Sequence, residues 1–246
     1  MELAWPLVLL AAFAGGALNA VAGGGSFLTL PALLFVGVAP VTANATGTLA
    51  LLPGYIASSL GYRRELGALR QTQPWWPLLL LSLAGGAAGA ALLLVTPDTL
   101  FRQLVPWLLL LATLLFLFAP RLLGQHASVH VRAFLPGIFL VSVYGGYFNG
   151  GLGILLMALY VLTSPVSMQH ANAAKNLLSA LLTSFAAVIY IAGDAVQWSY
   201  ALPMMAAGWL GGYVGARWGR RLPARTLRMI IIATGAIMTL LFFING

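Results

Sequence analysis

The chain has 246 residues, of which 61% are hydrophobic and only 7% are charged, and its formal net charge is +8 at pH 7. Soluble domains carry about 25% charged residues, so this composition, with a mean hydropathy of +0.97, excludes that class and indicates an integral membrane protein. The absence of cysteine excludes disulfides and thiolate metal sites, and the presence of only four carboxylates disfavours paired acids within a bilayer.

Apolar segments follow one another along the chain, and none shows the alternating polarity of a transmembrane β-strand. We expect an all-α membrane protein with helices at 3–22, 26–38, 42–61, 75–95, 101–119, 134–149, 151–163, 172–192, 200–218 and 226–244. Segments 26–38 and 151–163 are too short for a hydrocarbon core, which takes about 20 residues to cross. Each follows a glycine-rich break, at 22–26 and 149–153. We therefore predict two short helices that either span or re-enter.

The two halves of the chain repeat the same residues in the same order. Four matches recur after 126 or 128 residues: Ala43-Asn44-Ala45 with Ala171-Asn172-Ala173, Gly85-Gly86-x-x-Gly89-Ala90 with Gly211-Gly212-x-x-Gly215-Ala216, Pro77 with Pro203, and Pro97 with Pro223. Ordered matches at nearly one offset predict an internal duplication, a common way to build secondary transporters. We expect a first membrane repeat at 1–120, a cytoplasmic linker at 121–133 and a second repeat at 134–246, each with about five helical segments.

Arginines gather in loops that are not equivalent between the two repeats. Loop 62–74 holds three arginines, whereas its counterpart 193–199 holds only Asp194. In contrast, loop 96–102 holds one acid and one arginine, and its counterpart 217–228 holds five arginines. Because positive loops face the cytoplasm, we predict that the second repeat is inverted relative to the first, with both termini outside.

The two glycine breaks predict a binding site for an anion. Glycine lets the chain leave helical geometry and bring N–H groups close to a ligand, and the helix that follows points its positive dipole end at the same place. The candidate residues are Gly23, Gly24, Gly25 and Ser26 in the first half and Gly150, Gly151 and Gly153 in the second. Close helix packing is an equal alternative for the first three glycines. It is the better interpretation for the small-xxx-small positions Gly85, Gly89, Gly211 and Gly215.

Lys175 is the only lysine in the chain and lies near the start of an apolar helix. Its spacing places it on one helix face with Asn172 and Asn176, which makes a polar stripe within an apolar span. We expect the ammonium group to face a central cavity and to neutralise a bound anion. The alternative is an interfacial lysine that extends to water. The equivalent positions of the first half hold Asn44 and Thr46, which are polar but uncharged.

Further polar residues flank these elements. Asn19 and Asn149 lie beside the two breaks, where each could contact the ligand or cap a helix end. His170 is a candidate proton carrier because imidazole titrates near neutral pH, although a loop histidine at the interface is the alternative. His126 and His130 are four residues apart, but the sequence supplies no further ligands for a metal. We therefore expect no metal site and no cofactor.

Several motifs together resemble one family. The run Asn19-Ala-Val-Ala-Gly-Gly-Gly-Ser-Phe-Leu-Thr-Leu-Pro31 is similar to the first signature of the TauE/SafE family of sulfite exporters, and Ala43-Asn44-Ala45-Thr46 continues it. Asn149-Gly-Gly-Leu-Gly153 and Asn172-Ala-Ala-Lys-Asn176 resemble the second signature. The resemblance covers essentially the whole chain and implies a bacterial inner-membrane permease that exports sulfite or small organosulfonates.

The residues and the resemblance together predict export of a small anion by alternating access. Efflux needs no proton-carrying carboxylate, because a monovalent anion gains about 2.3 kcal/mol per 100 mV on leaving a cell with a negative interior. An anion channel and a non-transporting assembly subunit are the alternatives, whereas an enzyme would need a nucleophile–base pair or metal ligands. The expected partners are the anion and the lipid bilayer. A homodimer is compatible with a chain this small, and nucleic-acid binding is disfavoured because the arginines sit between apolar spans.

Overall fold

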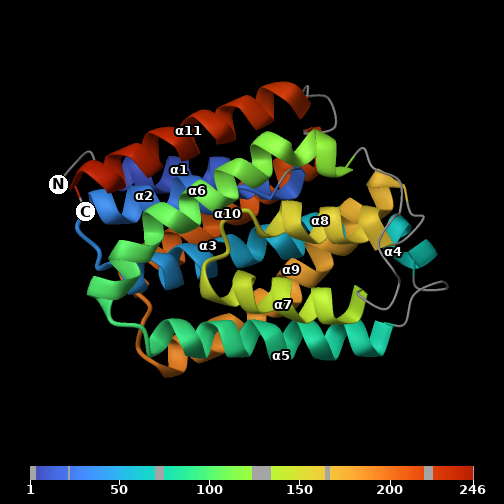
Figure 1. Cartoon of the computed structure of the whole chain (residues 1–246), viewed down its shortest axis with the longest axis horizontal. Helices are drawn as coiled ribbons and strands as arrows, with labels where there is room; N and C mark the ends of the chain where they lie inside the picture. Colours follow the sequence, from blue (N-terminus) through green and yellow to red (C-terminus); the bar gives the residue numbers. More distant parts are fainter. Residues whose placement is uncertain are drawn as a thin grey trace.

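The computed structural model describes residues 4–21, 23–69, 75–123, 134–163, 167–218 and 224–245. Within these ranges the chain forms helices and their connections, without a β-strand, so the predicted all-α class is confirmed (Figure 1). The helices are α1 (Ala4–Val21), α2 (Ser26–Phe35), α3 (Pro40–Gly61), α4 (Arg63–Leu69), α5 (Trp75–Leu94), α6 (Asp98–Leu123), α7 (Phe134–Tyr147), α8 (Leu152–Thr163), α9 (Met168–Ala192), α10 (Trp198–Trp218) and α11 (Ala224–Asn245).

Several helix ends differ from the predicted segments for local reasons. α2 ends at Phe35 rather than at residue 38, because Gly37 adopts a φ of +86° and the next N–H, of Val38, bonds back to the carbonyl of Leu33 at 3.1 Å. This is a glycine C-cap that stops a helix. α9 begins four residues earlier than predicted, because the hydroxyl of Ser167 caps it by accepting from the N–H of His170 at 3.4 Å.

Two further differences concern connections. The stretch predicted as loop 62–74 contains the short helix α4, with Glu65 in its first turn, where a carboxylate stabilises the helix dipole. α6 extends to Leu123, so the first residues of the predicted linker are helical. Most of that linker, residues 124–133, lies outside the described residues, as do His126 and His130.

The outer surface carries large apolar side chains. Leu60, Leu80 and Leu140 are each more than 60% exposed, as expected for side chains that face lipid. Among the described residues, three helices are long and apolar enough to cross a membrane by length and composition, namely Trp75–Leu94, Asp98–Phe118 and Gln169–Ala192. Shorter apolar helices, including α2 and α8, lie between them. This surface and these helices are those of a membrane protein.

The core contains two closely packed groups of three helices. In one, α10 packs against α1 and α3, and in the other, α5 packs against α7 and α9. Each group therefore combines helices from both halves of the sequence. α3 and α9 contact each other between the groups, and α6 and α11 pack together along another side (Figure 1).

Glycines permit this close packing. A Cβ at Gly211 would overlap the carbonyl of Phe13, and one at Gly215 would meet the backbone of Ala17 at 2.6 Å. On α5, a Cβ at Gly89 would overlap the carbonyl of Val143, and Gly85 lies equally close to α7. The predicted packing role of the small-xxx-small glycines is therefore confirmed.

The two ends of the molecule differ in what they hold. Both chain termini lie at one end, and α4 lies at the other, which is also where α7 and α11 begin (Figure 1). α4 contributes Arg63 and Arg64 to this second end. The short helices α2 and α8 extend from the middle of the molecule toward opposite ends (Figure 1).

Candidate functional site

The first glycine break connects α1 to α2 inside the protein. Gly23 adopts a φ of +85°, a conformation that favours glycine, and its N–H bonds to the carbonyl of Leu18 at 3.0 Å. The side-chain oxygen of Asn19 accepts a hydrogen bond from the N–H of Gly25 at 2.7 Å. Asn19 is 1% exposed. It therefore holds the start of α2 against the end of α1.

The second break connects α7 to α8 and has the same backbone feature. Gly151, which lies 128 residues after Gly23, adopts a φ of +76°, and Asn149 is also left-handed, with a φ of +62°. The Asn149 side chain accepts a hydrogen bond from the hydroxyl of Tyr55 at 2.9 Å and donates one to the hydroxyl of Thr183 at 3.4 Å. Asn149 thereby ties this break to both α3 and α9.

The two breaks touch each other. A Cβ at Gly23 would overlap the backbone of Gly153, in the first turn of α8. The first N–H groups of a helix have no acceptor within that helix, and its N-terminus carries the positive end of the dipole. α2 and α8 therefore bring two positive helix ends to one buried place, which is the arrangement that anion sites at helix N-termini use.

The polar stripe of α9 meets the end of α1 at this place. The Lys175 ammonium donates a hydrogen bond to the carbonyl of Asn19 at 2.8 Å. The amide groups of Asn172 and Asn176 each donate to the carbonyl of Ala20 at 3.4 Å. All three side chains therefore bind the last carbonyls of α1, which have no acceptor role within the helix and carry its negative dipole end.

Lys175 is fully buried, so the alternative that it extends to water is wrong. Its ion pairs are absent among the described residues, where its hydrogen bond goes to a backbone carbonyl. An ammonium group buried without a carboxylate carries a large desolvation cost unless other groups compensate. The site therefore has a positive charge that protein carboxylates, within the described ranges, do not neutralise.

Several polar atoms near this stripe have no hydrogen-bond partner among the described residues. They are the amide nitrogen of Asn19, the hydroxyls of Ser26 and Ser179, and the side-chain oxygens of Asn172 and Asn176. All five side chains are at least nine-tenths buried. Buried polar groups are normally hydrogen-bonded, so these atoms are free to bind a ligand.

The first-half counterpart of the stripe binds the other break. Asn44 donates a hydrogen bond to the carbonyl of Tyr147, the last residue of α7, at 2.9 Å. It thus does for α7 what Asn172 does for α1. Thr46, however, accepts from the N–H of Gln197 at 2.9 Å, in the connection between α9 and α10. The printed sequence motif had grouped Thr46 with the site, and its described hydrogen bond goes elsewhere.

The other predicted residues have local roles. Gly24 accepts a hydrogen bond from the N–H of Phe27 at 3.2 Å, in the first turn of α2. Gly150 accepts from the hydroxyl of Tyr144 at 2.5 Å. His170 lies in the first turn of α9 rather than in a loop, with its Nδ1 atom 2.7 Å from the hydroxyl of Ser167. Its described contact is therefore with the helix cap and not with Lys175.

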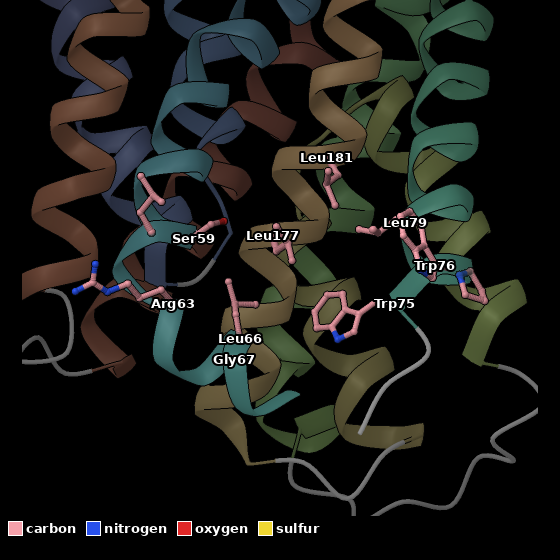
Figure 2. Close-up of a pocket in the computed structure, with 11 residues that line it drawn as sticks. Ser59, Arg63, Leu66, Gly67, Trp75, Trp76, Leu79, Leu177 and Leu181 are labelled. Atoms are coloured by element: carbon pink, nitrogen blue, oxygen red, sulfur yellow. The ribbon is translucent and has the colours of Figure 1, made fainter. Parts of the chain in front are cut away.

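A separate cavity of about 1030 Å³ lies among α3, α4, α5 and α9. Figure 2 shows Trp75, Leu177 and Leu181 around it, with Arg63 at one side. A helix turns 100° per residue, so Leu177 and Leu181 lie on the side of α9 opposite Lys175. The cavity wall is mostly apolar, and it is distinct from the polar stripe.

Sequence reasoning missed three members of the polar centre, namely Tyr55, Ser179 and Thr183. Ser179 and Thr183 continue the Asn172–Asn176 stripe at helical spacing, so a longer reading of that face would have found them. Tyr55 lies 128 residues before Thr183, the same offset as the repeat. Its partner Asn149 is visible only in the folded chain.

A helical membrane protein with a buried polar centre at two broken helices belongs to the class of membrane transporters. The sequence profile of the family "Sulfite exporter TauE/SafE" matches residues 8–242. The chain therefore belongs to the TauE/SafE family, as its motifs predicted. This is a family of transporters rather than of enzymes.

Curated relatives agree with this assignment. A probable membrane transporter protein, ORF9, from Sinorhizobium sp is 28% identical over 92% of this chain and 87% of its own length. A probable membrane transporter protein from Haemophilus influenzae is 27% identical over 92% of this chain and 89% of its own length. The probable membrane transporter protein YfcA from Escherichia coli K12 is 27% identical, with 93% and 85% covered. The likeness thus extends over nearly the whole length of each protein.

Proposed function

We propose that this chain exports a small anion, sulfite or an organosulfonate, across the bacterial inner membrane by alternating access. The observation that carries the proposal is the contact between Gly23 and Gly153 beside the fully buried Lys175. There, two positive helix ends and one ammonium group surround polar atoms that are free to bind a ligand.

Charge favours an anion over a cation. The described carboxylates lie at helix ends: Glu65 is in α4, Asp98 begins α6 and Asp194 follows α9. Sites for Na⁺ or divalent cations usually recruit carboxylates. A bound anion would instead compensate the buried ammonium group. The family's printed description, a sulfite exporter, supports an oxyanion of sulfur as this anion.

Reciprocal packing supports two inverted repeats. α10 of the second half packs on α1 and α3, and α5 of the first half packs on α7 and α9. The hydrogen bond from Asn44 to the end of α7 likewise mirrors that from Asn172 to the end of α1. In Figure 1, α1 starts at the end that holds the termini, whereas α7 starts at the other end. Opposite directions are expected for repeats inverted in the membrane.

The moving parts would be the two helix groups, α1–α3–α10 and α5–α7–α9. Their glycine contacts make each group rigid, and the α3–α9 contact and the two breaks lie between them. Rocking of one group against the other would open the polar centre to each side in turn. This division cuts across the sequence repeats, because each group contains helices from both.

The arginine-bearing end would face the cytoplasm. α4, with Arg63 and Arg64, lies opposite the chain termini (Figure 1), and positive ends of membrane proteins are cytoplasmic. Both termini would then be outside. Efflux of a monovalent anion from that side releases about 2.3 kcal/mol per 100 mV, so no coupled proton is required.

Flux from proteoliposomes tests the proposal. Purified protein is reconstituted with internal sulfite, sulfate, sulfoacetate, taurine or chloride, and efflux is measured at imposed potassium diffusion potentials. We expect saturable sulfite efflux that increases when the interior is negative. Efflux that does not saturate would identify a channel, and absence of flux for every anion would overturn transport. Flux that is indifferent to voltage would overturn electrogenic export.

Replacement of the lysine tests the site itself. Lys175→Met removes the charge at similar volume, and we expect sulfite efflux to fall at least about tenfold, the effect of one lost charged hydrogen bond. Lys175→Arg keeps the charge and should retain part of the flux. Arg217→Ala is the matched control, because this exposed arginine contacts only Tyr213 among its described hydrogen-bond partners. Unchanged flux in Lys175→Met would remove Lys175 from the site.

A further inference from the structure

We infer that the site selects anions that carry a hydrogen-bond donor next to the negative charge, and rejects anions that offer acceptors only. The unpartnered side-chain oxygens of Asn172 and Asn176 are the basis of this inference. It rests on the proposed function, because it specifies which substrates that anion site accepts. Hydrogen sulfite and sulfonates with a hydroxyl or amino group meet the requirement, whereas sulfate dianion and plain alkyl sulfonates do not.

The amide orientations follow from the carbonyl of Ala20. Both asparagines lie within 3.4 Å of this oxygen through their side-chain nitrogens. A carbonyl oxygen accepts hydrogen bonds and does not donate them, so each amide must present its N–H to it. Each side-chain oxygen is then directed away from Ala20, and both oxygens are buried without a partner among the described residues.

The same centre also offers free donors. The Lys175 ammonium has three N–H groups and uses one of them on the carbonyl of Asn19. The amide nitrogen of Asn19 is a further donor without a partner, and Ser26 and Ser179 each hold an unpartnered hydroxyl. These groups bind the anionic oxygens of a ligand. The two asparagine oxygens cannot, because they are acceptors themselves.

A substrate therefore needs both kinds of group. An acceptor-only anion would leave two buried carbonyl oxygens unpaired and close to its own negative charge. A ligand hydroxyl or amino group would pair with one of them. Sites that hydrogen-bond a substrate group discriminate strongly against analogues that lack it. We therefore expect selectivity of at least about tenfold between two anions that differ only in this donor.

A matched pair of sulfonates tests the inference on the wild-type protein. 2-Hydroxyethanesulfonate and propane-1-sulfonate differ by a hydroxyl in place of a methyl group, with the same charge and number of heavy atoms. In proteoliposomes, we expect efflux of the hydroxyl compound to exceed that of the alkyl compound at least about tenfold. Equal efflux would overturn the inference and leave anion export intact. Absence of efflux for both compounds and for sulfite would instead overturn the proposed function.

Substitutions assign the selectivity to the two asparagines. In the double variant Asn172→Leu/Asn176→Leu we expect the ratio between the two sulfonates to fall to within about twofold of unity, because the acceptors are gone. Ser82→Ala is the matched control, since Ser82 is also buried and unpartnered but lies on α5. It should keep the wild-type ratio. Retained selectivity in the double variant would overturn the role of these asparagines, and the wild-type pair remains decisive if the variant does not fold.

Discussion

The two glycine breaks have the same backbone but different surroundings. Gly23 and Gly151, at the same offset as the repeat, are both left-handed, with φ values of +85° and +76°. The end of α1 meets an ammonium group and two amides, whereas the end of α7 meets the single amide of Asn44. One repeated backbone can thus carry two chemically different halves, and the charge that would bind an anion is present in only one.

The largest difference between the breaks should appear in Gly→Ala variants. Gly23→Ala should lower the free energy of unfolding by about 2–5 kcal/mol, because it combines a left-handed conformation with overlap onto the Gly153 backbone. Gly151→Ala should cost about 2 kcal/mol, since its Cβ would meet the Cβ of Ala112 at 3.0 Å. Unfolding in detergent micelles measures both.

Gly37→Ala serves as the control for the backbone contribution. Its φ is +86°, and a Cβ there would meet nothing within 4 Å. It should therefore cost about 1 kcal/mol, from conformation alone. If all three variants lost the same stability, the close approach of the two breaks would not contribute, and the comparison between them would fail.

The reciprocal asparagines should differ by a smaller amount. Asn44→Ala removes the described hydrogen bond to Tyr147, at 2.9 Å, and should cost about 1–2 kcal/mol. Asn172→Ala should cost less than about 1 kcal/mol, because Asn176 still donates to the same carbonyl of Ala20. Chemical unfolding of both variants in the same detergent decides the order, and a reversed order would contradict the unequal support of the two helix ends.

The smallest effects are expected around Asn149. Tyr55→Phe removes the 2.9 Å hydrogen bond to its side-chain oxygen and should cost about 1 kcal/mol. Thr183→Val removes the longer bond, at 3.4 Å, and should cost about 0.5 kcal/mol. Thermal unfolding of these near-isosteric pairs provides the test. A greater loss from Thr183→Val would mean that α9, rather than α3, holds the second break in place.

Much of the fold could be predicted because its signals are local. The apolar segments gave the helices, and errors arose only where a cap decided the end, as at Gly37 and Ser167. α4 was missed because its short polar sequence resembles a loop. The exchange of α5 and α10 between the two halves could not be predicted, since glycine spacing shows that a face is closely packed but not which helix packs there.

The site was predicted as a list of residues rather than as an arrangement. Helical spacing correctly placed Asn172, Lys175 and Asn176 on one face. It did not reveal that they bind the end of α1, because that contact joins residues more than 150 positions apart. Asn19, which precedes a glycine run, was open to two interpretations, and in the structure it caps the start of α2.

The sequence alone determined the membrane class, the helices, the duplicated motifs and the single buried cation, because composition, periodicity and repetition are properties of the chain itself. Only the tertiary structure decided that the two breaks touch and that the helices of the two halves are exchanged between two groups. It also decided that Lys175 points inward to the α1 carbonyls rather than outward to water. Those outcomes depend on which distant surfaces fit together closely enough to satisfy buried polar groups, and local patterns carry no such information.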